Sequence, residues 1–560
     1  MAGGLLNLVS VGADNEILNS SNPGYVPISF FKTTYKKYTN FGKQKFRVDY
    51  NGSRVLQLTA PTTYTFKIPR NAELLLDSYL VMTLPDIYSP IFHPCEDTGY
   101  QWSPYEFKWI QYLGCQVIQD ITITCGSATL AKYTGDYLLN VVLRDYDTDK
   151  RNMFHSMTGN TLEYTNPANG NGRVNSYPST YYTTSNLGAE PSIRGKTLYI
   201  PIMAWFSMNN YCAFPLVATQ YNELNINITL RPIQDLFQVR DVFDPTNSFP
   251  YIRPDFNQHQ FQMYRFLQTP PSENLMPESY SNYISNWNAD IHLLCTYAFL
   301  SQEEASLFVK ENQVYLVKDV YQYSFPNTTG TKRVKLQSTN GLVAGWMMYL
   351  KRSDVSTRNE WSNYTNWPYS GSVPYDIGFA PDTTHDATIN TGIGPLYNIV
   401  NGIKQMTGIF TTGDFRIENQ KDILQTMGIL LSGDYRENTQ TRGVYDYIEK
   451  FASSKGSNND GLYCYNYELL TDPFSMQPSG AINMSNFKSV ELEITTSIPP
   501  FDASGVNMNV VYDNVSGQLL GVQQSNMWNL YQYYYDLYVI EERYNVMYFS
   551  NGGCGLMFAR

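Results

Sequence analysis

Histidine is scarce in this sequence, and its few positions form no pattern that is typical of metal binding or catalysis. No His-Glu-x-x-His motif occurs, and no cysteine and histidine residues have the spacing of a zinc site. The tripeptide His93-Pro94-Cys95 comes nearest to a cluster, yet it lacks at least one ligand. We therefore expect no catalytic residues, no cofactor and no metal, and so no enzyme.

Paired cysteines, long apolar runs and an excess of positive charge are missing as well. The seven cysteines include no Cys-x-x-Cys pair, which favours reduced, buried thiols in a protein that folds in the cytosol. No apolar run is long enough to span a membrane, and residues 1–12 lack the positive flank of a signal peptide. The formal net charge of −11 argues against direct, specific binding of nucleic acid.

The residues that are abundant indicate β-sheet. Tyr alone supplies 47 residues, whereas charged residues make up only 16% of the chain. Apolar residues alternate with polar ones at 224–231, where Leu224, Ile226 and Ile228 share one face. The same period of two occurs at 63–68 and at 490–495. This alternation predicts antiparallel sheets with one buried face and one wet face.

The length of 560 residues and a weak internal repeat predict two domains. An offset of 268 places 66–68 on 334–336 and also 224–226 on 492–494, because 334 − 66 and 492 − 224 are both 268. Six prolines between 241 and 278 mark a connector, since proline cannot donate to a sheet ladder. We expect an N-terminal arm at 1–47, a first sandwich at 48–240, a connector at 241–278 and a second sandwich at 279–560.

Helices and long loops interrupt the strands in a few places. Ser301 and Glu304 predict a capping box at the start of a short helix. The polar stretches at about 146–197 and 352–412 are far longer than hairpin turns, and we expect them to be displayed at a surface. In the adjacent acids Glu541-Glu542, a strand would point the two carboxylates to opposite faces, which favours a structural role over glycosidase chemistry.

A basic and aromatic segment precedes the first strands, and it is the candidate assembly arm. Nucleic acid, anionic lipid or acidic protein surfaces could all bind such a segment. A solvated arm without a specific partner is the simpler alternative. The candidate assembly residues are Lys32, Tyr35, Lys36, Lys37, Tyr38 and Phe41.

Several separate motifs resemble those of the major capsid proteins of nucleocytoplasmic large DNA viruses. They begin with Met1–Val9 and Ile28–Phe41 in the arm, followed by Phe214–Glu223. Gln477-Pro478-Ser479-Gly480, with Asn483 and Phe487 nearby, resembles a motif of the family's second domain. Similarity also covers 292–318, 424–433 and 537–558, in order along the chain. Lys36-Lys37 departs from the family, since many members carry arginines there.

The resemblance implies an all-β fold of two consecutive, antiparallel, eight-stranded jelly-roll sandwiches with long loop insertions and few short helices. It also implies a homotrimeric, pseudo-hexagonal capsomer in an icosahedral shell. The implied partners are neighbouring capsomers, minor capsid proteins and possibly a penton protein, with an inner membrane contacted only indirectly. The implied location is the virion capsid, after synthesis and assembly in the host cytoplasm.

One alternative function and one type of modification are also compatible with the sequence. A jelly-roll protein of the virion that binds glycans or attaches to the host has the same kind of fold. Asn327 and Asn363 lie in N-x-S/T sequons and are the candidates for glycosylation. Chance explains the number of sequons in a chain this rich in Asn, Ser and Thr, so their count carries no information.

Overall fold

The computed structural model describes most of the chain after the first thirty residues. It describes residues 31, 33, 35 and 37–558, apart from 51, 54, 92–104, 181–188, 245–248, 272–276, 338–339, 370–373, 375–393, 412–415, 458, 476, 502–507, 513–517 and 525–530. The chain divides into two units, Met1–Phe41 and Gly42–Arg560.

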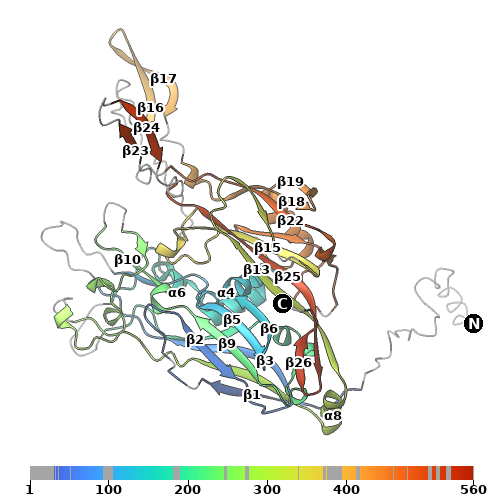
Figure 1. Ribbon diagram of the computed structural model, residues 1–560. Helices are drawn as coiled ribbons and strands as arrows, with labels where there is room; N and C mark the ends of the chain where they lie inside the picture. The colour runs from blue at the N-terminus through green and yellow to red at the C-terminus, as the bar shows by residue number, and fades with distance from the viewer. Residues whose placement is uncertain are drawn as a thin grey trace, which may run out of the picture. The chain divides into compact units, whose positions relative to one another are not determined.

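The first sandwich consists of two antiparallel sheets (Figure 1). One sheet has the order β1 (Gly42–Asp49), β12 (His292–Phe299), β3 (Leu74–Leu84) and β7 (Lys196–Pro201), with the short β8 (Phe214–Pro215) on β3. The other has the order β2 (Thr62–Lys67), β9 (Leu224–Leu230), β5 (Ile118–Cys125) and β6 (Ala128–Thr134). A small third sheet contains β4 (Phe107–Trp109), β10 (Phe237–Arg240) and β11 (Tyr251–Ile252).

The second sandwich repeats this arrangement. Its first sheet has the order β13 (Gln313–Phe325), β25 (Tyr535–Ser550), β15 (Leu342–Arg352) and β20 (Leu462–Asn466), extended by β21 (Ile482–Asn483) and β26 (Gly553–Leu556). Its second sheet has the order β14 (Thr331–Lys335), β22 (Val490–Thr496), β18 (Leu424–Leu431) and β19 (Asp434–Thr441). Each sandwich therefore has eight principal strands, and the predicted fold class is confirmed.

The internal repeat of the sequence corresponds to equivalent strands. The repeat matched β2 with β14 and β9 with β22. In the first sandwich β2 is hydrogen-bonded to β9, and in the second β14 is hydrogen-bonded to β22. Phe66 lies opposite Ile226, whereas Val334 lies opposite Leu492 and not Ile494, which a strict offset requires. The register differs by two residues, and a shift of two keeps the same side chains on the buried face.

Two of the expected segment boundaries differ from the strand pairing. β1 contains residues 42–47, which the sequence assigned to the arm, and it pairs with β12 along its whole length. β12 itself lies at 292–299, which the sequence assigned to the second sandwich, yet it pairs with β1 and β3 of the first. β12 is the last strand of the first sandwich, just as β25 is the last long strand of the second. The prolines at 241–278 correctly indicated irregular structure, but they gave no information on which strands pair with each other.

Alternating sequence produces alternating burial in β9. Leu224, Ile226, Ile228 and Leu230 are buried, whereas the residues between them are half-buried. β2 behaves in the same way, with Tyr64 and Phe66 inside. The predicted half-buried strands are confirmed at both places.

The stretch at 146–197 is more ordered than the sequence predicted. It contains α5 (Thr148–Thr158), α6 (Leu162–Thr165) and the 3-10 turn η1 (Pro167–Asn169). Phe154 and Tyr164 are buried in the core of the first sandwich. The expectation of a wholly displayed loop is therefore wrong for 146–165, because single large aromatic residues anchor otherwise polar helices.

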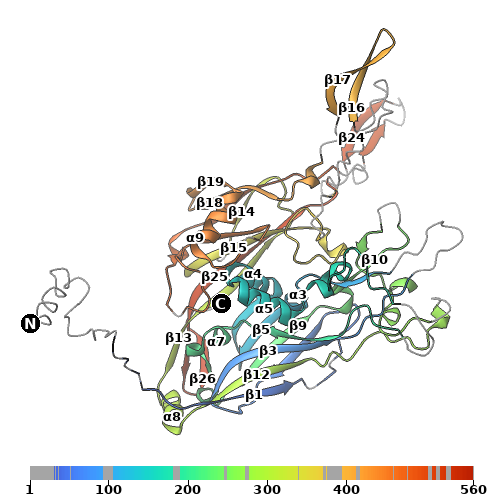
Figure 2. The ribbon, with the colours of Figure 1, turned by 180° about the vertical axis from the view of Figure 1, so that it is seen from behind.

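The stretch at 352–412 also contains regular structure. β16 (Gly394–Val400) and β17 (Ile403–Thr411) form a hairpin whose turn is Asn401-Gly402, and both turn residues have positive φ, 52° and 76°. Asn-Gly is the favoured pair for such a two-residue turn. β23 (Met508–Tyr512) and β24 (Leu519–Gln524) form a second hairpin, and both views draw the two hairpins next to each other (Figures 1 and 2).

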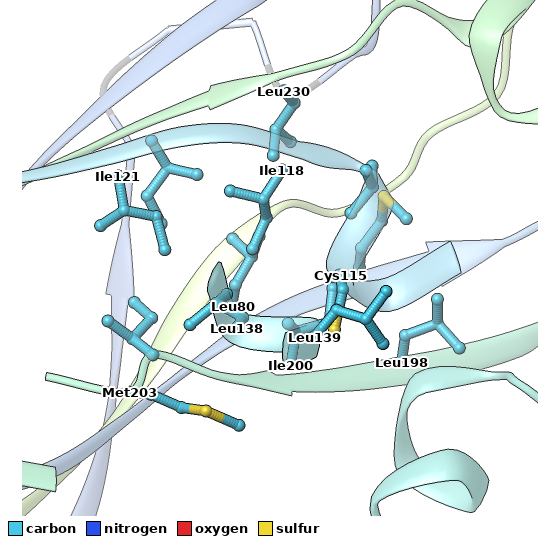
Figure 3. Packing of buried hydrophobic residues seen from close by; sticks show 14 of the residues in the cluster. Leu80, Cys115, Ile118, Ile121, Leu138, Leu139, Leu198, Ile200, Met203 and Leu230 are labelled. Atoms are coloured by element: carbon cyan, nitrogen blue, oxygen red, sulfur yellow. The ribbon is translucent and has the colours of Figure 1, made fainter. Parts of the chain in front are cut away.

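The helices are few and short, as predicted. α8 (Gln302–Lys310) begins after Ser301, whose hydroxyl accepts a hydrogen bond from the Glu304 amide at 3.4 Å, so the Ser301 part of the predicted capping box is confirmed. α4 (Gly135–Asp145) is buried along almost its whole length. Its Leu138 and Leu139 pack among Leu80, Cys115, Ile118 and Ile200 in the core of the first sandwich (Figure 3).

Candidate assembly site

The sheet that contains β15 and β25 has a hydrophobic core on each of its two faces. Trp346, Met348 and Leu350 of β15 face the core of the second sandwich. Met347 and Tyr349, which point the other way, belong to the core of the first sandwich. A strand that is buried on both faces is apolar throughout instead of alternating, which explains the run from Val343 to Leu350.

Helix α4 lies beside the second sandwich's β25 (Figures 1 and 2) and supplies a buried ion pair to it. Arg144 at its end bonds Glu542 of β25 at 2.9 Å and Asp145 at 2.9 Å, and all three side chains are at most 2% exposed. Tyr137 donates to Glu542, and Thr471 donates to Asp145. Burial alone would lower the pKa of Arg144, but the two carboxylates raise it well above its usual value. The guanidinium is therefore firmly charged.

A second ion pair joins the start of the same helix to β15. Lys351 bonds Asp136 at 2.8 Å, and Gln116 also donates to Asp136 at 2.9 Å. Burial would raise the pKa of Asp136, but Lys351 and Gln116 lower it below its usual value. Tyr364, from the segment after β15, donates to Asn140 in the middle of the helix. Polar contacts therefore hold α4 to the second sandwich from end to end.

These buried charges are suited to fixing geometry. Removing one partner of a buried pair typically costs about 3–5 kcal/mol, because the other charge is left without compensation. We call the set of Asp136, Arg144, Asp145, Lys351 and Glu542 the seam. The seam fixes the orientation of one sandwich against the other, as a rigid building block requires.

The adjacent acids Glu541 and Glu542 have structural roles, as predicted. The strand turns them to opposite faces: Glu541 accepts from the Trp346 indole at 2.7 Å and pairs with Arg543, whereas Glu542 joins the seam. The sequence analysis missed Arg144, which pairs with Glu542, and Asp136, which pairs with Lys351, since a buried charge is indistinguishable in sequence from a solvated one. The signal for them was an unusually apolar helix, Tyr137–Leu143, with charges only at its ends.

The candidate arm residues are exposed wherever the structure describes them. Tyr35 and Tyr38 are each 86% exposed, Phe41 is 61% exposed, and Lys37 is exposed too. Lys32 and Lys36 lie outside the described residues. Exposed aromatic rings on a basic segment are available to a partner, and the role of the arm stays a prediction.

The two candidate glycosylation sites differ. Asn363 is buried, and its side-chain nitrogen donates to Glu360 at 2.9 Å and to the Trp367 carbonyl at 2.6 Å. Burial makes Asn363 a poor acceptor for a glycan, because its polar loop folds back on itself. Asn327 is half-buried in a turn with φ of 51°, and its glycosylation stays a prediction.

An exposed apolar surface occurs where the sequence predicted none. It lies on the π-helical turn η10 (Val444–Ile448), on α9 (Glu449–Ser453) and on the neighbouring chain, where Thr471 donates to the Ser453 carbonyl at 3.0 Å. Phe451 is 93% exposed. We call this surface the α9 patch, and it consists of Tyr447, Ile448, Phe451, Leu469 and Leu470. Apolar residues at 444–451 resemble core in sequence, and Tyr445 is indeed buried, so only the backbone decides which of them face outward.

Neither metal chemistry nor a membrane span emerges from the part of the chain that the structure covers. Among the described residues, no three His, Cys, Asp or Glu side chains are grouped so that they could hold a metal ion. His93 and Cys95 lie outside these residues. No described helix combines the length and the apolar character needed to cross a membrane.

Two family models match consecutive parts of the chain. The first is the major capsid protein N-terminus, over residues 29–267. The second is the large eukaryotic DNA virus major capsid protein, over residues 300–555. Residues 268–299 lie between the two matches and contain β12, and the second match begins directly after that strand.

Individual relatives and solved structures agree with these matches. The chain is 28% identical to the major capsid protein of Phaeocystis pouchetii virus over 536 residues, which cover 89% of this chain and 93% of the relative. It is 22% identical to that of Paramecium bursaria Chlorella virus 1 over the full length of both. The Faustovirus major capsid protein has the same fold, with a TM-score of 0.59 at 13% identity over 98% of this chain and 99% of that one. Two matching sandwiches, ordered motifs and full-length relatives coincide, and the chain belongs to the major capsid proteins of large eukaryotic DNA viruses, whose icosahedral capsid it builds.

Proposed function

We propose that three copies of this capsid protein form one capsomer of near-hexagonal outline. The observation that carries the proposal is the duplication: two sandwiches with the same strand order lie side by side in each chain. Three such chains around one axis place six similar sandwiches in a ring. Closed rings of identical chains are the usual form of soluble oligomers.

The seam supports this proposal, because a ring closes only if the angle between its units is constant. Arg144 and Lys351 hold the first sandwich to the second through contacts at both ends of α4. The packing of β15 against the core of the first sandwich also holds the two sandwiches at one angle. Each chain is thereby a stiff pair of sandwiches.

We propose that the α9 patch contacts a second copy within the capsomer. Contiguous exposed apolar surface is costly in water and marks interaction sites on soluble proteins. A cyclic trimer uses one surface of each chain against a different surface of the next, so a single patch is enough for each contact. Phe451 of α9 and Ile448 of η10 are both well exposed, so both are available as anchors of an interface.

We further propose the roles of the remaining segments. The first jelly roll extends from β1 to β12 and the second from β13 to the C-terminus, with the arm before Gly42. The arm contacts neighbouring capsomers and minor capsid proteins, and possibly the penton protein, from the inner side of the shell. It binds no nucleic acid specifically and contacts an inner membrane only indirectly. Synthesis and assembly take place in the host cytoplasm.

Light scattering on the purified chain tests the trimer and the patch together. We expect the wild-type chain to be trimeric at low micromolar concentration and to survive mild denaturant. The double variant Ile448→Ser/Phe451→Ser should be a folded monomer. The control is Val174→Ser, at an exposed valine elsewhere, which should remain trimeric.

The possible failures of this experiment are distinguishable. A wild-type chain that is monomeric at this concentration would contradict the trimer. A trimeric double variant with unchanged dissociation would contradict only the α9 patch, and the capsomer would then be held by another surface.

A further inference from the structure

Two cysteines far apart in the sequence lie beside each other in the fold. Cys125 is the last residue of β5 in the first sandwich, and Cys554 lies in β26, the C-terminal strand of the second. β26 packs against β5, Cys554 packs against the core that contains Cys125, and the two side chains interact with each other. Cys125 is buried and Cys554 is half-buried, and neither is in a disulfide.

The surrounding backbone holds the two thiols at this place. Asn222 lies against both neighbouring glycines: a Cβ on Gly126 would be 2.9 Å from its Oδ1, and a Cβ on Gly553 would be 3.2 Å from its Nδ2. The Tyr221 amide donates to the Gly552 carbonyl at 3.1 Å. One short segment of the first sandwich thus packs against the residue after Cys125 and the residue before Cys554.

Regular strand pairing restrains each cysteine further. Cys125 lies opposite Leu224 in the ladder between β5 and β9. Cys554 lies opposite Phe549 in the ladder between β25 and β26. Two sheets therefore position the two cysteines beside each other, and both backbones are held by regular pairing.

We propose that Cys125 and Cys554 are a reversible redox pair whose disulfide ties the C-terminal hairpin of the second jelly roll to the first jelly roll. The chain folds with both thiols reduced and closes the bond when it meets an oxidant, as a virion does on leaving a reducing cytosol. The bond requires the observed contact alone and does not depend on the trimer.

Hydrogen peroxide is a suitable oxidant because it is close to water in size, and the buried thiol of Cys125 that it must reach lies beside the half-buried Cys554. The hydrogen bond from Cys554 is the largest influence on Cys125 and lowers its pKa, which favours its thiolate. Peroxide converts Cys125 to a sulfenic acid and releases one water. The Cys554 sulfur then attacks that sulfur, the S–S bond forms, and the hydroxide leaves with the Cys554 proton as a second water. Two thiols are oxidised and one peroxide is reduced.

The bond should act on the C-terminal hairpin, which β26 forms with β25 at the end of the chain. Cross-linking residues that are distant in sequence restricts the unfolded chain most. Covalent attachment should therefore raise the Tm by about 2–5 °C. The same bond should also slow removal of the C-terminal residues by carboxypeptidase, because β26 can no longer detach from the first sandwich.

The test uses the full-length protein, first reduced and desalted, then exposed to a small excess of peroxide. Peptide mapping without reductant should find one linked peptide that contains Cys125 and Cys554, and dithiothreitol should split it. Cys125→Ser and Cys554→Ser should lose both the link and the rise in Tm. Cys212→Ser is the matched control, since Cys212 is also half-buried, and it should keep both.

Peptide mapping of the oxidised wild-type protein tests the proposed disulfide even if a cysteine variant folds poorly. Sulfenic or sulfinic acids found separately on Cys125 and Cys554, or both thiols still reduced under conditions that oxidise them in the unfolded chain, would overturn the proposal. A linked peptide that joins either of them to another cysteine would overturn it too.

Discussion

At the scale of single residues, the burial of an ion pair determines how much it contributes to the stability of this protein. The pair of Arg144 and Glu542 is buried at the junction of the sandwiches, whereas the pair of Arg333 and Glu493 joins β14 to β22 at the surface. Arg144 has lost its hydration and depends on its partners, whereas the Arg333 side chain is 53% exposed and retains water. The same Arg–Glu pair therefore affects stability more when it is buried than when it lies at the surface.

The seam is tested by Glu542→Gln. We expect a loss of about 3 kcal/mol of stability, because Arg144 keeps its charge and loses a buried counter-ion. Glu493→Gln is the control and should cost at most about 1 kcal/mol. Unfolding in urea followed by tryptophan fluorescence measures both. Similar small losses in the two variants would show that the seam contributes little to holding the sandwiches together.

At the scale of elements, the buried face of each strand determines its sequence pattern. β9 lies in the middle of its sheet between β2 and β5, and only one of its faces is dry. β15 lies in a sheet with a core on each side and is apolar at nearly every position. A strand with one buried face therefore alternates apolar and polar residues, whereas a strand with two buried faces is apolar throughout.

The strand β9 provides the prediction at this scale. Ile226→Asp or Ile228→Asp should abolish folding, because a buried, unpaired carboxylate costs several kcal/mol. Asn225→Asp or Thr229→Asp, on the wetter face of the same strand, should change stability by about 0.5 kcal/mol. The yield of soluble protein and its circular dichroism report both. Equal damage on the two faces would mean that both faces of β9 are dry in the assembled protein.

At the scale of the whole molecule, the chain is a structural protein and not an enzyme, and its parts are arranged for assembly. Long connections leave the ends of jelly rolls without disturbing the core. The hairpin β16–β17 and its neighbour β23–β24 are such additions to the second sandwich. Residues 146–165 are not, because their helices pack into the first sandwich.

Limited proteolysis of intact and opened particles tests which parts face outward. We expect early cleavage between 366 and 412, the part of the predicted surface stretch 352–412 that follows the buried Asn363. Residues 1–41, the arm that we propose on the inner side of the shell, should be cleaved late. Residues 146–165 should resist in both samples, since Phe154 and Tyr164 anchor them. Rapid loss of the arm from sealed particles, with 366–412 intact, would reverse the proposed orientation of the capsomer.

The sequence by itself determined the local structure and the kind of protein. Alternation at 224–230 depends only on neighbouring residues, the cap at Ser301 on four consecutive ones, and the repeat on a comparison of the chain with itself. None of these signals depends on a contact between distant residues, so each could be identified before any fold was known. Motifs in the right order were enough to predict the family.

Only the tertiary structure decided which distant residues meet. Whether Arg144 is solvated or buried depends on β25, about four hundred residues later, and Asn363 is hidden because its own loop closes over it. The assignment of β12 to the first sandwich depends on its partners β1 and β3. The contact between Cys125 and Cys554 depends on both sandwiches at once. Burial and pairing are properties of the packed chain, because they require surfaces that local sequence does not contain.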